Sequence, residues 1–409
     1  MLEQLRLENF KSFKKAQIDL GQITVLIGPN GTGKSSWLQA MMLMRQSSGH
    51  STLRTQGKYL NLGGYKDLLH RGNKGYRGRH LKIGIAGTSE LAERYDEIAV
   101  EKHIPYIYES EFEEGQLVGH EGKISISGDE LVFRLFGNER SVTPIPLEFR
   151  GVSFSFNIQN LIGAPVIVSG CSKAPEIDER KLELVRHYVV ESLRTLHQTL
   201  ESVFFVPAIR GFAAPSYPLQ DMPVTDFVTS AGAVEHAQRL ASTLAYRREL
   251  EDILSKWCMR ITGITVRIAL REHRVVTIET SLGAAPKFNI VHEGFGSNQL
   301  IFGLAQLATS PTHSIICWEE PEIHLHPRAQ SELVNVLVEV AKREDKQIVI
   351  TTHSEHILYP FVSAVRNGSL TRDELAIYYF EERGEQPRRV EQDECGDIYE
   401  WGRNFFSAP

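Results

Sequence analysis

Residues 28–35 read GPNGTGKS, which matches in full the phosphate-loop pattern G-x-x-x-x-G-K-[ST]. The strand-like run ITVLI precedes this loop and the helix-like run WLQAMMLMRQ follows it. The glycines let backbone N–H groups turn toward phosphate oxygens, and the start of the helix adds a partial positive charge. The motif therefore predicts ATP and Mg²⁺ as cofactors, with Lys34 on the β- and γ-phosphates and the Ser35 hydroxyl on the metal. We assign the nucleotide contacts to Gly28, Asn30, Gly31, Thr32, Gly33, Lys34, Ser35 and Ser36.

A second group of reactive side chains lies in residues 318–327, WEEPEIHLHP, after the mostly apolar run SIIC. One interpretation is a metal centre built from Glu322, His324 and His326. A zinc centre needs three or four ligands with supporting hydrogen bonds, and the sequence shows no further ligand. We therefore favour structural roles for the two histidines.

The other interpretation of WEEPE is the acidic strand end that a phosphate loop requires. We assign Glu319 to the Mg²⁺ shell and Glu320 to polarising the attacking water. A glutamate at the first of these places departs from the usual aspartate, and its longer arm favours contact with the metal through water. After a further strand, VITTHSEHIL places His353 at a strand end, where a neutral imidazole can hydrogen-bond a γ-phosphate.

The composition sets the broad class of the protein. The chain has 409 residues, a net charge of −6 and 42% hydrophobic residues, enough for two or three domain-sized units. No run approaches the ~20 apolar residues of a membrane span, and the N-terminus lacks the apolar core of a secretory signal. Four scattered cysteines exclude a disulfide scaffold or zinc knuckle: Cys171, Cys258, Cys317 and Cys395. We expect a cytoplasmic protein with no membrane partner.

The elements that must position these groups follow from hydrophobic periodicity. Residues 82–170 are rich in strand patterns, 50–82 reads as a loop, and 204–223 as an ordered loop. Helical blocks are predicted at 176–202 and 233–261, and strands at 264–270, 274–280 and 287–294. Helix 297–308, strand 314–319, helix 328–342 and strand 347–354 then alternate, which predicts parallel strands with helical crossovers.

This pattern predicts an α/β P-loop ATPase head interrupted by a β-rich plus helical insert. The expected parts are 1–80, the N-terminal part of the head, 81–263, the insert, and 264–409, the C-terminal part of the head.

The order of phosphate loop, GFGSNQ turn, acidic strand and TTHS resembles the ABC-type ATPase heads of the SMC and RecF group. WEEPEIHLHP is most similar to the overcoming-lysogenization-defect (OLD) ATPases and their relatives without a TOPRIM domain. LENFKSF, LNLGGYKDLLHRG, FFVPAIRG and DIYEWGRNFFS also resemble that group.

The resemblance implies that two heads sandwich ATP in a homodimer or higher homo-oligomer. Gly296, Ser297 and Gln299 of one chain would then face the γ-phosphate bound at Lys34 of the other, although GFGSNQ differs from the transporter signature LSGGQ. Only about 55 residues follow His353, too few for a TOPRIM nuclease at usual domain sizes. The resemblance therefore implies a separate effector, such as a nuclease, in anti-phage defence.

Two alternatives remain, a transporter's nucleotide-binding subunit and an ATP-driven DNA clamp without an effector. The signature, EEPEIHLHP and the long insert disfavour the transporter. The stretch 54–82 predicts a nucleic-acid contact or, alternatively, a solvated loop or a contact to nucleotide or partner chain. Its cations are Arg54, Lys58, Lys66, Arg71, Lys74, Arg77, Arg79 and Lys82. For Arg210 we favour a structural role over a phosphate contact, and Lys11 and Ser12 are expected to approach the nucleotide.

Overall fold

The computed structural model describes the backbone of residues 1–48, 50, 52–71, 79–90, 103–126, 129–136, 143–149, 152–159, 167–172, 179–221, 233–283, 285–393 and 398. Lys74, Arg77, Cys395 and most of the DIYEWGRNFFS motif lie outside the described residues.

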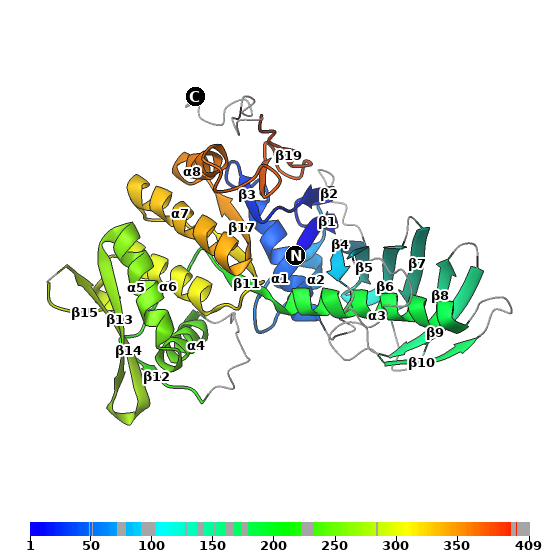
Figure 1. Ribbon diagram of the computed structural model, residues 1–409, viewed down its shortest axis with the longest axis horizontal. Coiled ribbons are helices and arrows are strands. Elements are labelled where there is room, and N and C mark those ends of the chain that lie inside the picture. Colours follow the sequence, from blue (N-terminus) through cyan, green and yellow to red (C-terminus); the bar gives the residue numbers. More distant parts are fainter. Residues whose placement is uncertain are drawn as a thin grey trace.

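A six-stranded sheet forms the centre of the molecule (Figure 1). Its first five strands are parallel, and only the last is antiparallel. This confirms the predicted α/β alternation with parallel strands. The strand order is β11 (Val203–Val206), β16 (Ile315–Glu319), β17 (Gln347–Thr352), β3 (Ile23–Ile27), β18 (Leu375–Tyr379) and β19 (Arg388–Arg389).

Helices cover both faces of this sheet, which explains why its parallel strands are apolar along their whole length. Val349 of β17 packs into the core that includes α1 (Lys34–Ser47), whereas Ile348 and Ile350 pack into the opposite core. That second core includes residues of α6 (Phe295–Thr309), α7 (Pro327–Glu344) and α8 (Glu355–Arg366).

A nine-stranded antiparallel sheet lies beside the head, and α3 (Glu179–Glu201) runs along it (Figure 1). A hydrogen bond of 2.9 Å between the Tyr108 and Ser192 hydroxyls joins the helix to the sheet. The strand order is β10 (Ile167–Ser172), β9 (Val152–Gln159), β8 (Thr143–Phe149), β7 (Asp129–Phe136), β6 (Gln116–Ile126), β5 (His103–Glu113), β4 (His80–Glu90), β1 (Leu2–Phe10) and β2 (Phe13–Asp19).

Both large sheets cross the boundaries expected from the sequence. Strand β4 of the expected insert pairs with β1 of the N-terminal part, and β11 of the insert pairs with β16 of the C-terminal part. The insert is therefore continuous with the head through hydrogen-bonded strands. The division of the chain into three parts remains a prediction.

A third unit packs a small antiparallel sheet on two helices, α4 (Ala233–Tyr246) and α5 (Glu249–Thr262). The helical block predicted at 233–261 forms these two helices, which are separated at Arg247, and three acidic residues lie in the first turn of α5. The sheet contains β12 (Tyr217–Pro218), β13 (Ile264–Arg271), β14 (Val275–Leu282) and β15 (Phe288–Asn289).

Three further expectations from the sequence need correction. The strand predicted at 287–294 shrinks to β15, and a 3₁₀ turn, η2 (Ile290–His292), follows because Asn289 caps it. The expected loop 204–223 begins as a strand, because Val203–Val206 is wholly buried beside β16. The loop 50–82 contains the short helix α2 (Tyr65–Leu68) and the start of β4.

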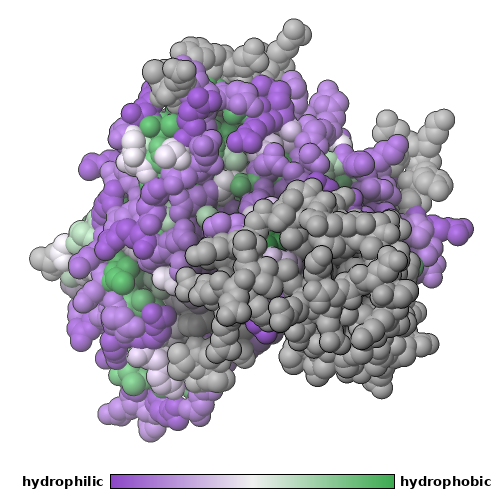
Figure 2. Space-filling view, turned by 45° about the vertical axis from the view of Figure 1, so that its right-hand side comes forward, coloured by the Kyte–Doolittle hydropathy of each residue, from purple (hydrophilic) through white to green (hydrophobic). Residues whose placement is uncertain are grey.

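The described surface in the view of Figure 2 is mostly hydrophilic, with apolar residues in small separate patches. Among the helices of the described residues, none combines the length and the apolar character that crossing a bilayer requires. The large apolar side chains are instead collected in the two cores beside the central sheet.

Candidate active site

The predicted site residues meet at one edge of the central sheet. Strands β16, β17 and β3 are parallel neighbours, so their carboxyl ends lie side by side. The phosphate loop follows β3, Glu319 ends β16 with Glu320 directly after it, and His353 follows β17. Ligand sites of parallel α/β sheets form at this edge.

The phosphate loop is held tightly by its neighbours. Gly28 has a φ of 153°, and a Cβ there would lie 2.3 Å from the Phe380 carbonyl oxygen; a Cβ on Gly33 would meet the Phe13 ring at 2.8 Å. Only glycine fits at these two positions. The Lys34 ammonium donates hydrogen bonds to the carbonyls of Gly28 and Pro29 at 2.9 and 2.7 Å. Burial lowers the pKa of Lys34 to about 8, against the opposing effect of Glu320 and Glu322.

Glu319 lies against the start of helix α1. Its carboxylate accepts a hydrogen bond from the Ser35 hydroxyl and, through Oε2, one from the Ala208 N–H at 3.3 Å. Its other oxygen, Oε1, is buried and has no hydrogen-bond partner within the described part of the chain. Burial raises the pKa of Glu319, and the hydrogen bonds from Ser35 and Ala208 oppose this. A buried carboxylate oxygen beside a hydroxyl suits a small hard cation such as Mg²⁺, which takes few protein ligands and completes its shell with water and phosphate.

Glu320 and His353 face each other at the more open side of this edge. Glu320 Oε1 lies 3.5 Å from His353 Nε2, and the side chains are 33% and 30% exposed. Glu320 has a left-handed backbone with φ 42°, and its N–H donates to the Thr351 carbonyl at 2.9 Å. Burial and the Lys34 charge lower the pKa of His353, while Glu320 and the Gly28 backbone raise it. This favours the neutral imidazole.

The histidines of WEEPEIHLHP have structural contacts. His326 is the N-cap of α7, and its Nδ1 accepts a hydrogen bond from the Arg328 N–H at 3.3 Å. The His324 ring packs edge-on against Phe295 at 5.1 Å. Within the described residues, no group of three or more His, Cys, Asp or Glu side chains has an arrangement suited to a metal ion. These contacts give both histidines structural roles.

The signature residues lie at the start of α6. Gly296 and Ser297 are partly exposed in its first turn, and Gly296 packs so closely on the His324 carbonyl that a Cβ would lie 2.4 Å from that oxygen. Gln299 is only 3% exposed. A side chain buried in its own chain does not face a partner's nucleotide, so the expectation for Gln299 needs correction.

Arg210 is a buried cation for which the sequence favours a structural role. Its guanidinium donates to the carbonyls of Glu319 at 2.9 Å, Glu320 at 3.2 Å and Gln299 at 3.2 Å, and it stacks 5.5 Å from the Trp318 ring. Burial lowers its pKa to about 10. Arg210 therefore ties the end of β16 to α6, a structural role.

Other contacts were not visible in the sequence. The Asn298 amide bonds both backbone groups of Phe212, at 2.7 and 3.0 Å, and so fixes the loop that carries Arg210. Glu322 contacts the turn after β17. Ser12 lies beside Gly33 of the phosphate loop. Burial lowers the pKa of Lys11, and the charge of Glu319 opposes this.

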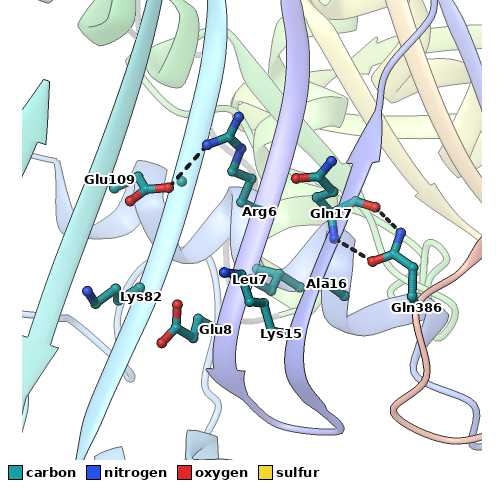
Figure 3. Close-up of a pocket in the computed structure, with 10 residues that line it drawn as sticks. Arg6, Leu7, Glu8, Lys15, Ala16, Gln17, Lys82, Glu109 and Gln386 are labelled. Atoms are coloured by element: carbon teal, nitrogen blue, oxygen red, sulfur yellow. Dashed lines mark hydrogen bonds and ion pairs between the residues drawn. The ribbon is translucent and has the colours of Figure 1, made fainter. Parts of the chain in front are cut away.

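The stretch 54–82 is only partly a basic surface. Gln46, at the end of α1, fixes the loop with four hydrogen bonds to the backbone of Arg54, Tyr59 and Leu60. Lys82 instead lines a shallow pocket on the nine-stranded sheet, where Arg6 pairs with Glu109 at 3.3 Å (Figure 3). Lys82 itself lies 3.2 Å from Glu111, so this part of the stretch is neutralised. Among the described residues of this stretch, the exposed cations are Arg54, Lys58, Lys66, Arg71 and Arg79.

Comparisons with known proteins agree with this geometry. Residues 168–358 match a family described as an AAA domain, whose description also names the AbiEii toxin and a Type IV TA system, and residues 1–108 match an AAA ATPase domain. An OLD nuclease of Thermus scotoductus is 23% identical over 369 residues, which cover 87% of this chain and 59% of that protein. The chain is an ATPase with an OLD-like head.

Two chromosome-associated proteins are also similar. The chromosome partition protein Smc of Methanocaldococcus jannaschii is 41% identical over 54 residues, 13% of this chain and 5% of that protein. The chain thus spans less than two thirds of the length of either curated relative. A crystal structure of the SmcHead bound to the C-winged helix domain of ScpA is 12% identical, with a TM-score of 0.49 over 96% of this chain and 98% of that one.

The two matched regions divide the OLD-like head between them. The region 1–108 contains the phosphate loop, and the region 168–358 contains Glu319, Glu320 and His353. ATP binding and hydrolysis belong to this head.

Proposed function

We propose that this OLD-like head hydrolyses ATP with Mg²⁺ at the edge formed by β3, β16 and β17, using Glu320 as general base and His353 as γ-phosphate sensor. The observation that carries the proposal is the contact of Glu320 with His353 at 3.5 Å, beside the phosphate loop. A carboxylate close to a neutral imidazole and a lysine provides a base, a hydrogen-bond donor and a phosphate contact in one place.

The proposed reaction assigns one task to each side chain. Lys34 and the N–H groups of the loop bind the β- and γ-phosphates. Glu320 takes the proton of the attacking water as its oxygen bonds to the γ-phosphorus, and the bond from that phosphorus to the bridging oxygen breaks, releasing ADP. His353 donates a hydrogen bond to a γ-phosphate oxygen and so links the presence of that phosphate to the turn before α8.

Ser35 and Glu319 are the residues that would hold Mg²⁺. The bound ion would neutralise charge on the β- and γ-phosphate oxygens. The buried Oε1 of Glu319, which no other described group hydrogen-bonds, and the adjacent Ser35 hydroxyl support this assignment.

The proposal extends to assembly around the nucleotide. Gly296 and Ser297 are accessible at the start of α6, and next to them Phe295 is 62% exposed. Near the same edge, Ile209 is 85% exposed, one residue from the Ala208 N–H that bonds Glu319. Apolar side chains this exposed support contact with a second copy of the chain, whose α6 completes the site.

We further propose that ATP turnover regulates a separate effector, most simply a nuclease, in anti-phage defence. The support is the similarity to the OLD nuclease, of which this chain covers 59%.

The test is Glu320→Gln, which keeps the shape of the side chain but cannot accept a proton. Turnover of ATP should fall by about 10²–10⁴, while ATP still binds and light scattering shows a larger or more stable assembly than the nucleotide-free form. Glu355→Gln removes a carboxylate in the first turn of α8 and serves as the control with unchanged turnover. Near-normal hydrolysis by Glu320→Gln would overturn the assignment.

A further inference from the structure

Glu322 connects the two strand ends that carry the proposed catalytic groups. Its Oε1 accepts a hydrogen bond from the Thr352 hydroxyl at 2.6 Å and a second from the His353 backbone N–H at 2.8 Å. Thr352 is the last residue of β17, whereas Glu322 lies in the turn after β16. One carboxylate oxygen therefore holds the backbone of His353 in a fixed place relative to the WEEPE turn.

The direction of these bonds is determined by a third one. The Ser354 N–H donates to the Thr352 Oγ1 at 3.0 Å, so the Thr352 hydroxyl hydrogen is available for Glu322. Glu322 Oε1 thus receives two donors from consecutive residues of the THS turn. The second oxygen of Glu322, Oε2, is buried and has no hydrogen-bond partner among the residues that the structure describes.

A second pair of hydrogen bonds connects the same turn to the segment after β16. The Ser354 hydroxyl donates to Gln330 Oε1 at 2.5 Å, and Gln330 Nε2 donates to the Leu325 carbonyl at 2.8 Å. Leu325 belongs to the WEEPEIHLHP segment and Gln330 to α7. The turns after β16 and β17 are therefore joined by side chains at two points, and Nε2 of His353 lies 3.5 Å from Oε1 of Glu320.

We propose that Glu322 is a positioning residue, whose carboxylate sets the backbone of His353 so that the imidazole stays in register with Glu320 and the γ-phosphate. The inference rests on the proposed roles of Glu320 and His353. Misplacement of a catalytic group by a fraction of an ångström to one ångström lowers the rate without removing the group itself.

Glu322 also faces the two buried cations of the site. Its charge raises the pKa values of Lys34 and Arg210, against the burial that lowers both. Burial raises the pKa of Glu322 itself, and the hydrogen bonds from Thr352 and His353 oppose this. The experiment must therefore distinguish the effect of losing the two hydrogen bonds from the effect of losing the negative charge.

Glu322→Ala removes both hydrogen bonds and the charge, and Glu322→Gln removes the charge but keeps a carbonyl oxygen that accepts both donors. We expect Glu322→Ala to lower kcat on the order of 10²-fold with an unchanged KM for ATP. Glu322→Gln should recover much of this loss. A kcat of Glu322→Gln as low as that of Glu322→Ala would overturn the hydrogen-bond role.

The decisive measurement is a double-mutant cycle of Glu322→Ala with His353→Ala. If Glu322 acts only through His353, the double variant turns over ATP as slowly as His353→Ala alone. A full further loss in the double variant would show a general structural role and overturn the inference. Thr352→Val removes one donor and keeps the shape; a kcat between those of wild type and His353→Ala supports the proposal even if Glu322→Ala does not fold.

Including Glu320→Gln in the same series shows whether the positioning role of Glu322 or the proposed function is wrong. If Glu320→Gln and His353→Ala lower kcat but Glu322→Ala and Thr352→Val do not, the positioning role is wrong and the proposed function stands. If Glu320→Gln itself leaves hydrolysis intact, the proposed function is wrong, and the positioning role falls with it.

Discussion

The carboxylate Oε1 of Glu320 lies 3.5 Å from Nε2 of His353, and the two residues come from the ends of adjacent parallel strands. The register of β16 on β17 places Glu319 opposite Thr351, one and two residues before this pair. A shift of one residue along either strand would turn alternate side chains to the other face of the sheet. Strand register therefore sets the catalytic geometry proposed here.

Lys34→Ala should weaken ATP binding by on the order of 10²-fold without unfolding the protein. The ammonium contacts only loop carbonyls, so its loss leaves no cavity between packed apolar side chains. Loss of a charge-assisted contact to phosphate should cost about 3 kcal/mol of ATP affinity. Calorimetry with ATP measures this, and Lys14→Ala on the exposed side of β2 is the matched control. ATP affinity equal to that of wild type would refute the phosphate-loop assignment.

Glu319→Gln should weaken the dependence of ATP binding on Mg²⁺. The amide retains the volume of the side chain and can still pair with the Ser35 hydroxyl, but it lacks the negative charge that favours the cation. The measurement is a titration with a fluorescent ATP analogue in Mg²⁺ and in EDTA. Glu8→Gln, on the outer face of the nine-stranded sheet, controls for the loss of a carboxylate. An identical Mg²⁺ dependence in Glu319→Gln and wild type would remove Glu319 from the metal shell.

His236 should make stability depend on pH. Its ring is 2% exposed, its Nε2 lies 2.6 Å from Gln306 Oε1, and burial lowers its pKa to about 4. Between pH 6.5, its ordinary pKa, and about 4 the unfolded chain binds a proton that the folded chain does not. Stability should therefore fall as pH falls through this window, by on the order of 3 kcal/mol.

Urea unfolding at pH 7 and pH 4.5 tests this for wild type and His236→Gln. The variant keeps an amide donor for Gln306 but has no group that titrates, so its stability should fall less over this interval. Carboxylates with raised pKa values are common to both proteins and cancel in the difference. Parallel loss of stability in the two proteins would contradict the prediction.

The exposed cations of the loop after α1 predict salt-dependent binding of single-stranded nucleic acid. Arg54, Lys58 and Arg71 project from a loop that Gln46 fixes to the end of α1. Binding by counterion release weakens as salt rises. Reversal of these three residues to glutamate should abolish binding in fluorescence anisotropy, whereas reversal of Lys82, which pairs with Glu111, should have little effect. Absence of binding by wild type at low salt, with and without ATP, would retire the nucleic-acid interpretation.

The sequence by itself determined the parts of the site that depend on local spacing. GPNGTGKS between a strand and a helix specifies the phosphate loop, because the chemistry needs glycines, a lysine and a helix N-terminus in consecutive positions. Buried runs that alternate with helices specify parallel strands, whose carboxyl ends share one edge. These two facts together predict that Glu320 and His353 lie close to Lys34.

Only the tertiary structure decided which polar side chains face the site and which lie beneath it. Gln299 is buried, Arg210 donates to the carbonyls of Glu319 and Gln299, and Glu322 accepts the backbone N–H of His353. From the sequence, Gln299 was expected at a partner's nucleotide and Glu322 was weighed as a metal ligand. The tertiary structure also decided the joining of β4 to β1 and of β11 to β16. Periodicity reports the secondary structure of each segment, but partners far apart in the chain are chosen by packing and by the need to satisfy buried polar groups.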